Sequence, residues 1–333
     1  MNNFFFSIII PVYNGMNNYL PDCLNSIWKQ SIDSALYEVI CVDDGSTDQT
    51  LNYLNSECKQ HPNLHILAQP RHEGGRDKGV LKAQGKYIIF IDQDDYFHED
   101  SIIQAYTHLC KNDLEVLITE SAYQFRDRPH NNFQLNLPNK HIVTGEEFIL
   151  TNGFVYAPWR FIIRRDFYLD NNLFFLNVAV PDVIWSVNTL FHVKQIQYQP
   201  ILLLHYNKAE SGFTDNMYRN YDSIKANTFA GNYLFDMSHS NFANSVKEPL
   251  LDLADTYYNF SCKYMLGLYA SYKSKKELVN YIKASTGKRR WVKLAKQNAS
   301  LYALISLFTV PLFRIARYYH RKHFAKKLQN NNR

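Results

Sequence analysis

Three acidic side chains and one amide follow a run of apolar residues near position 90. Asp92-Gln93-Asp94-Asp95 comes directly after Tyr87–Ile91. Two carboxylates in D-x-D spacing can hold a hard divalent cation, because Mg²⁺ and Mn²⁺ prefer oxygen ligands and often share their coordination with substrate phosphates. An acidic turn after a strand is the alternative. Carboxylates packed at the end of a buried strand repel one another, which favours the cation.

A second acidic group closes an earlier apolar run. Asp43-Asp44-Gly45-Ser46 follows Val39–Val42. Asp-Gly is a turn sequence, and Ser46 or Thr47 could cap a helix that starts near Gln49. The turn leaves the two adjacent carboxylates unexplained. A carboxylate there could accept hydrogen bonds from a base imide and a ribose hydroxyl.

Cations lie between these two acidic groups, in Gly74-Gly75-Arg76-Asp77-Lys78-Gly79. We expect a flexible loop just ahead of a helix, which is an environment for a phosphate or a nucleotide. A solvated turn is the alternative. Neither a GxxxxGK[ST] segment nor a GxGxxG after the first strand occurs, which argues against a dinucleotide fold.

The elements that would position these groups alternate along the first hundred residues. Strands are expected at Phe4–Val12, Glu38–Val42, Leu64–Ala68 and Tyr87–Ile91, and helices at Tyr19–Gln30, Gln49–Gln60 and Lys78–Gln84. This β-α-β-α-β pattern predicts a parallel sheet with right-handed crossovers. Such sheets bind ligands at the carboxyl ends of their strands, where Tyr13-Asn14, Asp43-Asp44 and Asp92–Asp95 fall.

The pattern is less regular after about Asp100. We expect a helix at Ser101–Lys111, a strand at Leu114–Glu120, a polar loop at Arg126–Lys140, a helical segment near Gly145–Thr151 and mostly helix from Tyr218, including Leu250–Tyr272. With 333 residues and 46% apolar composition, the chain can form one large or two modest domains with a hydrophobic core.

The cysteines and the amino-terminal sequence indicate the cellular compartment of the protein. Five scattered cysteines without a CxxC pair indicate reduced thiols in a cytosolic protein. The apolar start Phe4–Ile10 lacks a basic region and a small-residue cleavage site. It is therefore typical of a buried first strand and not of a signal peptide.

Three segments support a family resemblance. Ser7–Asn14 (SIIIPVYN), Val42–Asp48 (VDDGSTD) and Gly85–Asp95 (GKYIIFIDQDD) strongly resemble, in order and spacing, the family 2 glycosyltransferases of the GT-A fold that build bacterial surface polysaccharides. The resemblance is strong over residues 4 to 100 and weaker to about Thr214. It implies an α/β, Rossmann-like, mostly parallel sheet flanked by helices. The helical pattern from Tyr218 onward adds a mainly helical C-terminal extension.

The resemblance also implies a division of the chain and a nucleotide site. The catalytic domain would cover residues 1–215, with a nucleotide-sugar half at 1–100 and an acceptor half at 101–215, followed by a helical extension at 216–296. The residues implied to bind the nucleotide are Pro11, Tyr13, Asp43, Asp44, Arg76 and Asp92. Arg76 matches the arginine of the family's alanine-arginine-asparagine segment, whereas Asp77 replaces its asparagine.

The metal and the catalytic base follow from the same resemblance. Asp94 would chiefly bind Mg²⁺ or Mn²⁺, with Asp92 facing the ribose of the donor or the metal. Val178–Trp185 resembles the family's Glu-Asp motif, with Pro181 in place of the glutamate and Asp182 retained. An inverting transfer needs a carboxylate that takes the proton of the acceptor hydroxyl, which would be Asp182. Taken alone, an Asp after Pro is more often a helix cap.

Two further residues are implied on the acceptor side. Trp159 begins a stretch, Trp159–Arg165, that resembles the acceptor-lining segment of the family, and its ring could stack on a sugar. His205 lies in Leu203–Asn207, which resembles the segment after the base, and could reach the metal or a phosphate. A histidine beside a leucine run is more often a core residue.

The C-terminal tail differs in charge from the rest of the chain. Lys283–Arg333 contains 13 basic and no acidic residues, which leaves 23 basic against 31 acidic residues before it. Gln297–Phe313 is uncharged and precedes a cationic cluster with two tyrosines. We expect residues 297–333 to bind an anionic membrane surface and not nucleic acid, because a nucleic-acid arm needs no apolar stretch. Packing of this segment against the catalytic domain is the alternative.

Together these observations predict an inverting, metal-dependent glycosyltransferase that uses a nucleotide-sugar donor, with UDP as the expected nucleotide. The acceptor would be a glycan or a lipid-linked molecule at the inner face of the cell membrane, to which a cytoplasmic protein is peripherally bound. Two rivals are a membrane-associated glycan- or nucleotide-binding protein whose catalytic site has decayed, suggested by Asp77 and Pro181, and an aspartyl phosphotransferase. The phosphotransferase needs an aspartate after the first strand, where this chain has Tyr13-Asn14.

Overall fold

The computed structural model describes residues 4–17, 19–70, 74–125, 135–176, 178, 180–208, 221–240 and 244–267. These residues form two compact units. The first contains the described residues up to 208 except 178 and 180, and the second contains 178, 180 and the described residues from 221 onward. The predicted membrane-binding tail at 297–333 lies outside the described residues. No helix within the described ranges is long and apolar enough to cross a membrane.

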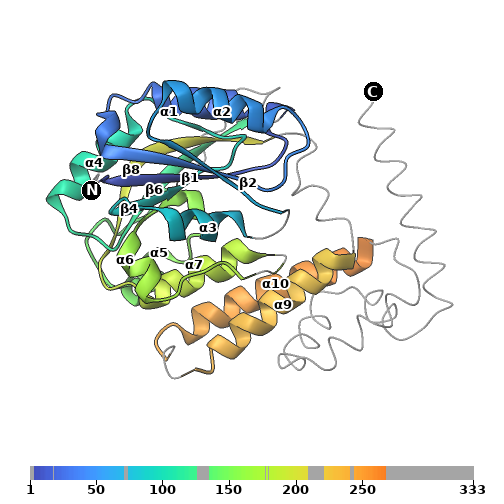
Figure 1. The fold of residues 1–333 in the computed structure, drawn as a ribbon. Helices are drawn as coiled ribbons and strands as arrows, with labels where there is room; N and C mark the ends of the chain where they lie inside the picture. Colours follow the sequence, from blue (N-terminus) through green and yellow to red (C-terminus); the bar gives the residue numbers. More distant parts are fainter. Residues whose placement is uncertain are drawn as a thin grey trace, which may run out of the picture. The chain divides into compact units, whose positions relative to one another are not determined.

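An eight-stranded sheet forms the centre of the first unit, in the order β3-β2-β1-β4-β7-β6-β8-β5 (Figure 1). The strands are β1 Phe6–Val12, β2 Tyr37–Asp43, β3 Leu64–Ala68, β4 Tyr87–Phe90, β5 Tyr96–Phe97, β6 Val116–Phe125, β7 Phe161–Arg164 and β8 Ile196–Lys208. β1 to β4 are mutually parallel, as are β6 and β8, whereas β7 and β5 run antiparallel to their neighbours. This confirms the predicted α/β fold with a mostly parallel sheet.

Helices cover both faces of this sheet, with α1 and α2 on one face and α3, α6 and α7 on the other (Figure 1). The helices of the first unit are α1 Leu20–Trp28, α2 Thr50–Gln60, α3 Gly75–Lys82, α4 Ser101–Lys111, α5 Gly145–Asn152, α6 Arg165–Asp170 and α7 Pro181–His192, with short 3₁₀ turns η1 Gly15–Asn17, η2 Ser34–Leu36 and η3 Pro158–Arg160.

Successive side chains of β1 point to opposite faces of the sheet and contribute to the hydrophobic core on both faces. Ile8 and Ile10 are fully buried in the cluster that includes Leu24 of α1. Ile9 points to the other face, where a Cβ on Gly79 of α3 would lie 2.4 Å from its Cγ2 atom. Only a glycine therefore lets α3 approach β1 this closely, and α3 carries Arg76.

The structure contradicts one local prediction and one of the alternatives. Residues 75–79 form the first turns of α3 and not a flexible loop, because Gly74 adopts a left-handed conformation with φ of 76° and turns the chain directly into the helix. Ser46 and Thr47 do not cap α2. The Oδ1 atom of Asp48 accepts the backbone N–H of Thr50 at 3.0 Å, and the Ser46 hydroxyl instead accepts the N–H of Asn14.

The described part of the second unit is a helix pair, α9 Tyr221–Met237 and α10 Lys247–Gly267. A Cβ on Gly231 would lie only 2.6 Å from the ring of Tyr258. The glycine therefore allows the two helices to pack closely. The Tyr258 hydroxyl donates to Asn232 at 2.9 Å. A helical region after the sheet domain agrees with the predicted helical extension.

Candidate active site

The carboxyl ends of β1 and β4 are joined by Gln93, the amide between the two predicted metal ligands. Its Oε1 atom accepts the N–H of Tyr13 and its Nε2 atom donates to the carbonyl of Tyr13, both at 2.9 Å. Pro11 lies two residues before Tyr13, in β1. A Cβ on Gly75, at the start of α3, would be 3.4 Å from the Cβ atom of Pro11. The D-x-D segment, the end of β1 and the start of α3 therefore lie together, as the sheet prediction requires.

Asp43 ends β2 and is only 1% exposed. Its Oδ2 atom accepts the N–H of Ser46 at 3.2 Å, whereas Oδ1 has no hydrogen-bond partner among the described residues. A buried carboxylate oxygen without a donor is costly, so it suits a ligand that supplies an N–H or O–H group. The neighbouring Asp44 accepts from Gln69 at 2.8 Å.

Arg76 connects the end of β4 with the start of α7. One terminal nitrogen of its guanidinium lies 2.5 Å from Oδ1 of Asp92, and the other lies 4.0 Å from Oδ1 of Asp182. The three side chains are 22%, 29% and 35% exposed, so a ligand can reach all of them. A guanidinium in this position can bind a diphosphate beside two carboxylates.

Asp182 lies in the first turn of α7, directly after Pro181 at its start. A carboxylate is stabilised at a helix N-terminus, and proline is favoured at the first helical position. Burial raises the pKa of Asp182, the charge of Asp92 raises it further, and Arg76 opposes both. A carboxylate with a raised pKa is a better proton acceptor than an ordinary aspartate, which fits the predicted base.

Asp77, the departure from the family pattern, has a structural role. Its carboxylate accepts the hydroxyl of Tyr168 at 2.7 Å and the N–H of Phe175 at 3.0 and 3.2 Å. The Phe175 ring lies under the guanidinium of Arg76, 5.5 Å from ring centre to Cζ, and stacks on Trp185 of α7 at 5.0 Å. Asp77 thereby holds the aromatic residue that supports Arg76.

The acidic cluster carries more negative charge than its surroundings stabilise. Burial raises the pKa of Asp94 to about 6, and the charge of Asp92 adds to this effect. Asp95 is 1% exposed, accepts the N–H of Asn207 at 2.9 Å through Oδ1, and has a pKa raised well above the ordinary value by burial and by both neighbouring carboxylates. Its Oδ2 atom has no hydrogen-bond partner in the described part of the chain.

A divalent cation fits this chemistry in part. The carboxylates of Asp92 and Asp94 are ligands that Mg²⁺ and Mn²⁺ prefer, and a cation would relieve their repulsion. No group of three or more His, Cys, Asp or Glu side chains within the described ranges could hold a metal ion. A cation here would therefore complete its coordination with donor phosphates and water.

Neighbouring rings hold the two predicted acceptor-side residues. Trp159, in η3, stacks on Tyr206 at 5.2 Å between ring centres. His205, in β8, stacks on Tyr96 at 4.7 Å, and its Nε2 atom lies 3.0 Å from Nδ1 of His98. These contacts orient both rings, and contacts of either ring with a substrate stay predictions.

Residues 7–170, which contain the carboxyl ends of β1, β2 and β4 and the start of α3, match the sequence model of glycosyl transferase family 2. The chain carries a family 2 glycosyltransferase domain. The match confirms the family resemblance seen in the sequence. Asp182 lies beyond the matched residues.

Relatives of the family 2 domain include two poly(ribitol-phosphate) glycosyltransferases. The chain is 28% identical over 197 residues to the poly(ribitol-phosphate) beta-glucosyltransferase of Bacillus spizizenii, covering 57% of this chain and 30% of that protein. It is 29% identical over 177 residues to the poly(ribitol-phosphate) beta-N-acetylglucosaminyltransferase TarS of Staphylococcus aureus, covering 51% of this chain and 29% of the relative. The matched segment thus spans about a third of these two relatives.

Solved structures confirm the GT-A fold of the family 2 domain. The crystal structure of residues 1–349 of S. aureus TarS in complex with UDP-GlcNAc superposes with a TM-score of 0.70 at 21% identity, covering 96% of this chain and 92% of that one. The mannosyltransferase PcManGT of Pyrobaculum calidifontis, in complex with GDP-Man and Mn²⁺, superposes with a TM-score of 0.52 at 12% identity, covering 92% and 86%.

Proposed function

We propose that this chain transfers a sugar from a nucleoside-diphosphate sugar to a hydroxyl of a glycan or lipid-linked acceptor, with inversion at the anomeric carbon, during synthesis of a cell-surface polysaccharide. The observation that carries the proposal is the position of Arg76 between Asp92, on the donor side, and Asp182, the proposed base. This position supports the proposal, because the Arg76 guanidinium could bind the leaving diphosphate while it lies 4.0 Å from a carboxylate that could take the acceptor proton.

The reaction follows from these positions. Asp182 takes the proton of the acceptor hydroxyl while the oxygen attacks the anomeric carbon. The bond between that carbon and the diphosphate oxygen breaks, and Arg76 stabilises the negative charge that develops on the diphosphate. The unpartnered Oδ1 atom of Asp43 accepts a hydrogen bond from the nucleotide base or the ribose.

A divalent cation is part of the proposal. Asp94 and Asp92 would hold Mg²⁺ or Mn²⁺, which neutralises the diphosphate when bound. The repulsion within the acidic cluster, which contributes to the raised pKa of Asp94, supports this assignment. The solved structure of PcManGT is a complex with GDP-Man and Mn²⁺, and the TarS crystal structures are complexes with UDP-GlcNAc and with UDP. We therefore propose UDP as the nucleotide and Mn²⁺ as a suitable cation for the first assays.

Attachment to an anionic membrane through residues 297–333 completes the proposal. It is supported by the uncharged segment Gln297–Phe313 and the basic residues that follow it. Co-sedimentation with vesicles that contain phosphatidylglycerol should be strong for the full chain, weak for residues 1–296, and reduced by salt. Equal sedimentation of the two proteins would contradict this part of the proposal.

The experiment that tests the proposed function is turnover of a panel of UDP- and GDP-sugars, with Mn²⁺ and with EDTA, in the presence of poly(ribitol phosphate), neutral oligosaccharides and lipid-linked sugars. We expect transfer from one donor class, abolished by EDTA. Donor binding in calorimetry without hydrolysis or transfer to any acceptor would instead favour a decayed, nucleotide-sugar-binding protein. The contacts of Asp77 argue against decay, because this substitution supports Arg76.

A further inference from the structure

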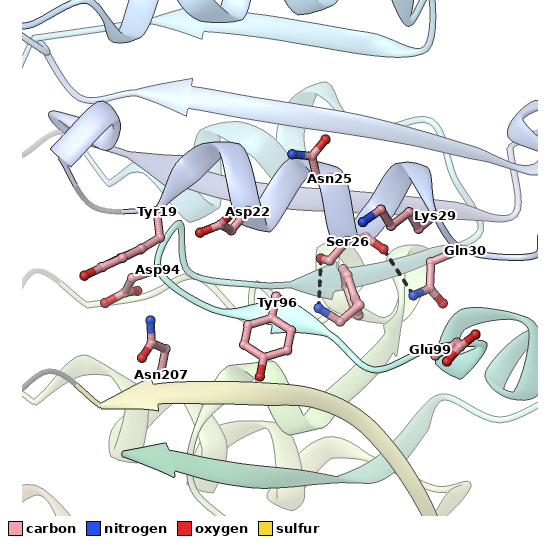
Figure 2. A pocket seen from close by; sticks show the side chains of 11 residues that line it. Tyr19, Asp22, Asn25, Ser26, Lys29, Gln30, Asp94, Tyr96, Glu99 and Asn207 are labelled. Carbon is pink, nitrogen blue, oxygen red and sulfur yellow. Dashed lines mark hydrogen bonds between the residues drawn. The ribbon is translucent and has the colours of Figure 1, made fainter. Parts of the chain in front are cut away.

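A pocket of about 700 Å³ lies beside the acidic cluster, outside the Arg76 and Asp182 contacts. Figure 2 shows it between α1 and the segment that carries Tyr96, with Asp94 toward one end and Glu99 toward the other. Asn207 of β8 lies beside Asp94. The pocket therefore begins at a predicted metal ligand and extends along α1.

The spacing of residues in α1 produces one wall of this pocket. The buried face of the helix consists of Leu20, Cys23, Leu24 and Ile27. Asp22, Asn25 and Lys29 follow one another at intervals of three and four residues, which places them together on the opposite, exposed face. Their side chains make no hydrogen bond or ion pair with other residues in the described ranges, so they are available to a ligand.

The floor of the pocket is already formed. The Ser26 hydroxyl accepts the N–H of Phe97 at 2.9 Å, and Gln30 accepts the N–H of Ile102 at 3.1 Å and donates to the carbonyl of His98 at 2.8 Å. These bonds fix the wall residues of α1 against the chain that follows β4. A pre-formed concave site loses little conformational entropy on binding.

The lining favours an uncharged ligand with many hydroxyl groups. Tyr96 offers a ring whose orientation is fixed by its stack on His205, and sugar and alditol C–H groups pack on such rings. Asp22 and Glu99 can accept hydroxyl hydrogens, whereas Lys29 is the one cation among the described lining residues; Asp94, the proposed metal ligand, lies at the donor end of the pocket. A phosphate would face an excess of carboxylates, and like charges at a binding surface oppose association.

We propose that this pocket binds an uncharged, hydroxyl-rich segment of the acceptor, a sugar or alditol unit next to the one that reacts. That this ligand is part of the acceptor rests on the proposed function. Binding of the ligand can be measured without turnover. It makes α1 and β5 the acceptor-binding wall of the site, adjacent to the donor side at Asp94.

A substitution that fills the pocket tests the proposal. Asn25→Trp places a large ring on the exposed face of α1, and Asn55→Trp makes the same change at an exposed position of α2 that does not line the pocket. Saturation-transfer NMR would use maltotriose, ribitol and ribitol 5-phosphate as probes, with wild type and both variants. UDP affinity and the melting temperature of each variant confirm that the fold and the donor side are intact.

We expect maltotriose or ribitol to bind wild type and Asn55→Trp alike, and Asn25→Trp to weaken that binding by about tenfold or more. Ribitol 5-phosphate should bind about fivefold more weakly than ribitol. Equal binding of the neutral probes to Asn25→Trp and wild type, no binding of either neutral probe, or a preference for the phosphate would overturn the proposal. If none of the UDP- and GDP-sugars is turned over, the proposed function is wrong. The binding results would then still decide whether the pocket binds a neutral, hydroxyl-rich ligand.

Discussion

The guanidinium of Arg76 lies 4.0 Å from the carboxylate of Asp182 while its other terminal nitrogen is paired with Asp92. Burial and the charge of Asp92 raise the pKa of Asp182, and Arg76 is the group that counteracts them. The residue proposed to stabilise the leaving diphosphate therefore also lowers the proton affinity of the proposed base. In the proposed mechanism, donor binding and the base strength of Asp182 are coupled through Arg76.

Arg76→Gln tests this coupling. Loss of the cation removes stabilisation of the diphosphate, so we expect the transfer rate to fall by about 10²-fold. It also removes the charge that lowers the pKa of Asp182, so the acidic limb of the kcat/KM profile should move to higher pH. The control is Lys82→Gln, the same change of charge at an exposed position in the last turn of α3. An acidic limb that stays in place would show that Arg76 does not act on the base.

Asp94→Asn tests the metal assignment. The variant keeps the shape of the side chain but loses the charge that a hard cation prefers. We expect UDP to stabilise the wild type more strongly with Mn²⁺ than without it, measured as the rise in melting temperature, and this difference to disappear in the variant. Glu99→Gln, which removes a nearby exposed carboxylate, should retain it. Equal Mn²⁺-dependent stabilisation in wild type and Asp94→Asn would exclude Asp94 as a ligand.

Asp77→Asn should increase the free energy of unfolding at pH 7. Burial raises the pKa of Asp77 above its ordinary value, so the folded state binds the proton more tightly than the unfolded state and the charged form opposes folding. An asparagine oxygen can still accept from Tyr168 and Phe175. The gain should vanish as the pH is lowered below about 4, where the aspartate is protonated in both states. Urea unfolding at the two pH values measures it, and a loss of stability at pH 7 would refute the argument.

Gly79→Ala tests the packing that positions α3. A Cβ at this position would lie 2.4 Å from Cγ2 of Ile9, so β1 and α3 must move apart. We expect a loss of about 1–3 kcal/mol in the free energy of unfolding, together with weaker UDP binding because Arg76 is carried by the same helix. Lys82→Ala, at an exposed position of α3, should change neither quantity. A fully stable Gly79→Ala protein would show that the helix has room to shift.

The donor half of the site could be predicted from the apolar runs that mark strands and from the polar residues at the ends of those strands. Apolar runs before Asp43 and Asp92 indicate buried parallel strands, and parallel strands bring their carboxyl ends to one edge of the sheet. The start of α3 was not predictable from apolar spacing, because its first turn consists of Gly75, Arg76 and Asp77 and has no apolar residue. The left-handed conformation of Gly74 decides where this helix begins.

The contacts between distant segments could not be read from the sequence. Phe175 lies 98 residues after Asp77, and no local pattern indicates that its N–H bonds to that carboxylate. Asp22, Asn25 and Lys29 recur at helical spacing in α1, but such spacing is also typical of a solvent-exposed helix face and does not indicate a pocket. The pocket exists only because β5 and β8 place Tyr96 and Asn207 opposite these residues.

The most direct test of the central claim is the transfer rate of Asp182→Asn, measured with the donor that the panel identifies. The amide keeps the size of the side chain but cannot take the acceptor proton, so we predict a fall of about 10²–10⁴-fold in kcat with unchanged affinity for UDP. Glu146→Gln, in the first turn of α5, is the matched control and should retain the wild-type rate. A transfer rate of Asp182→Asn equal to that of the wild type would contradict the assignment of Asp182 as the base.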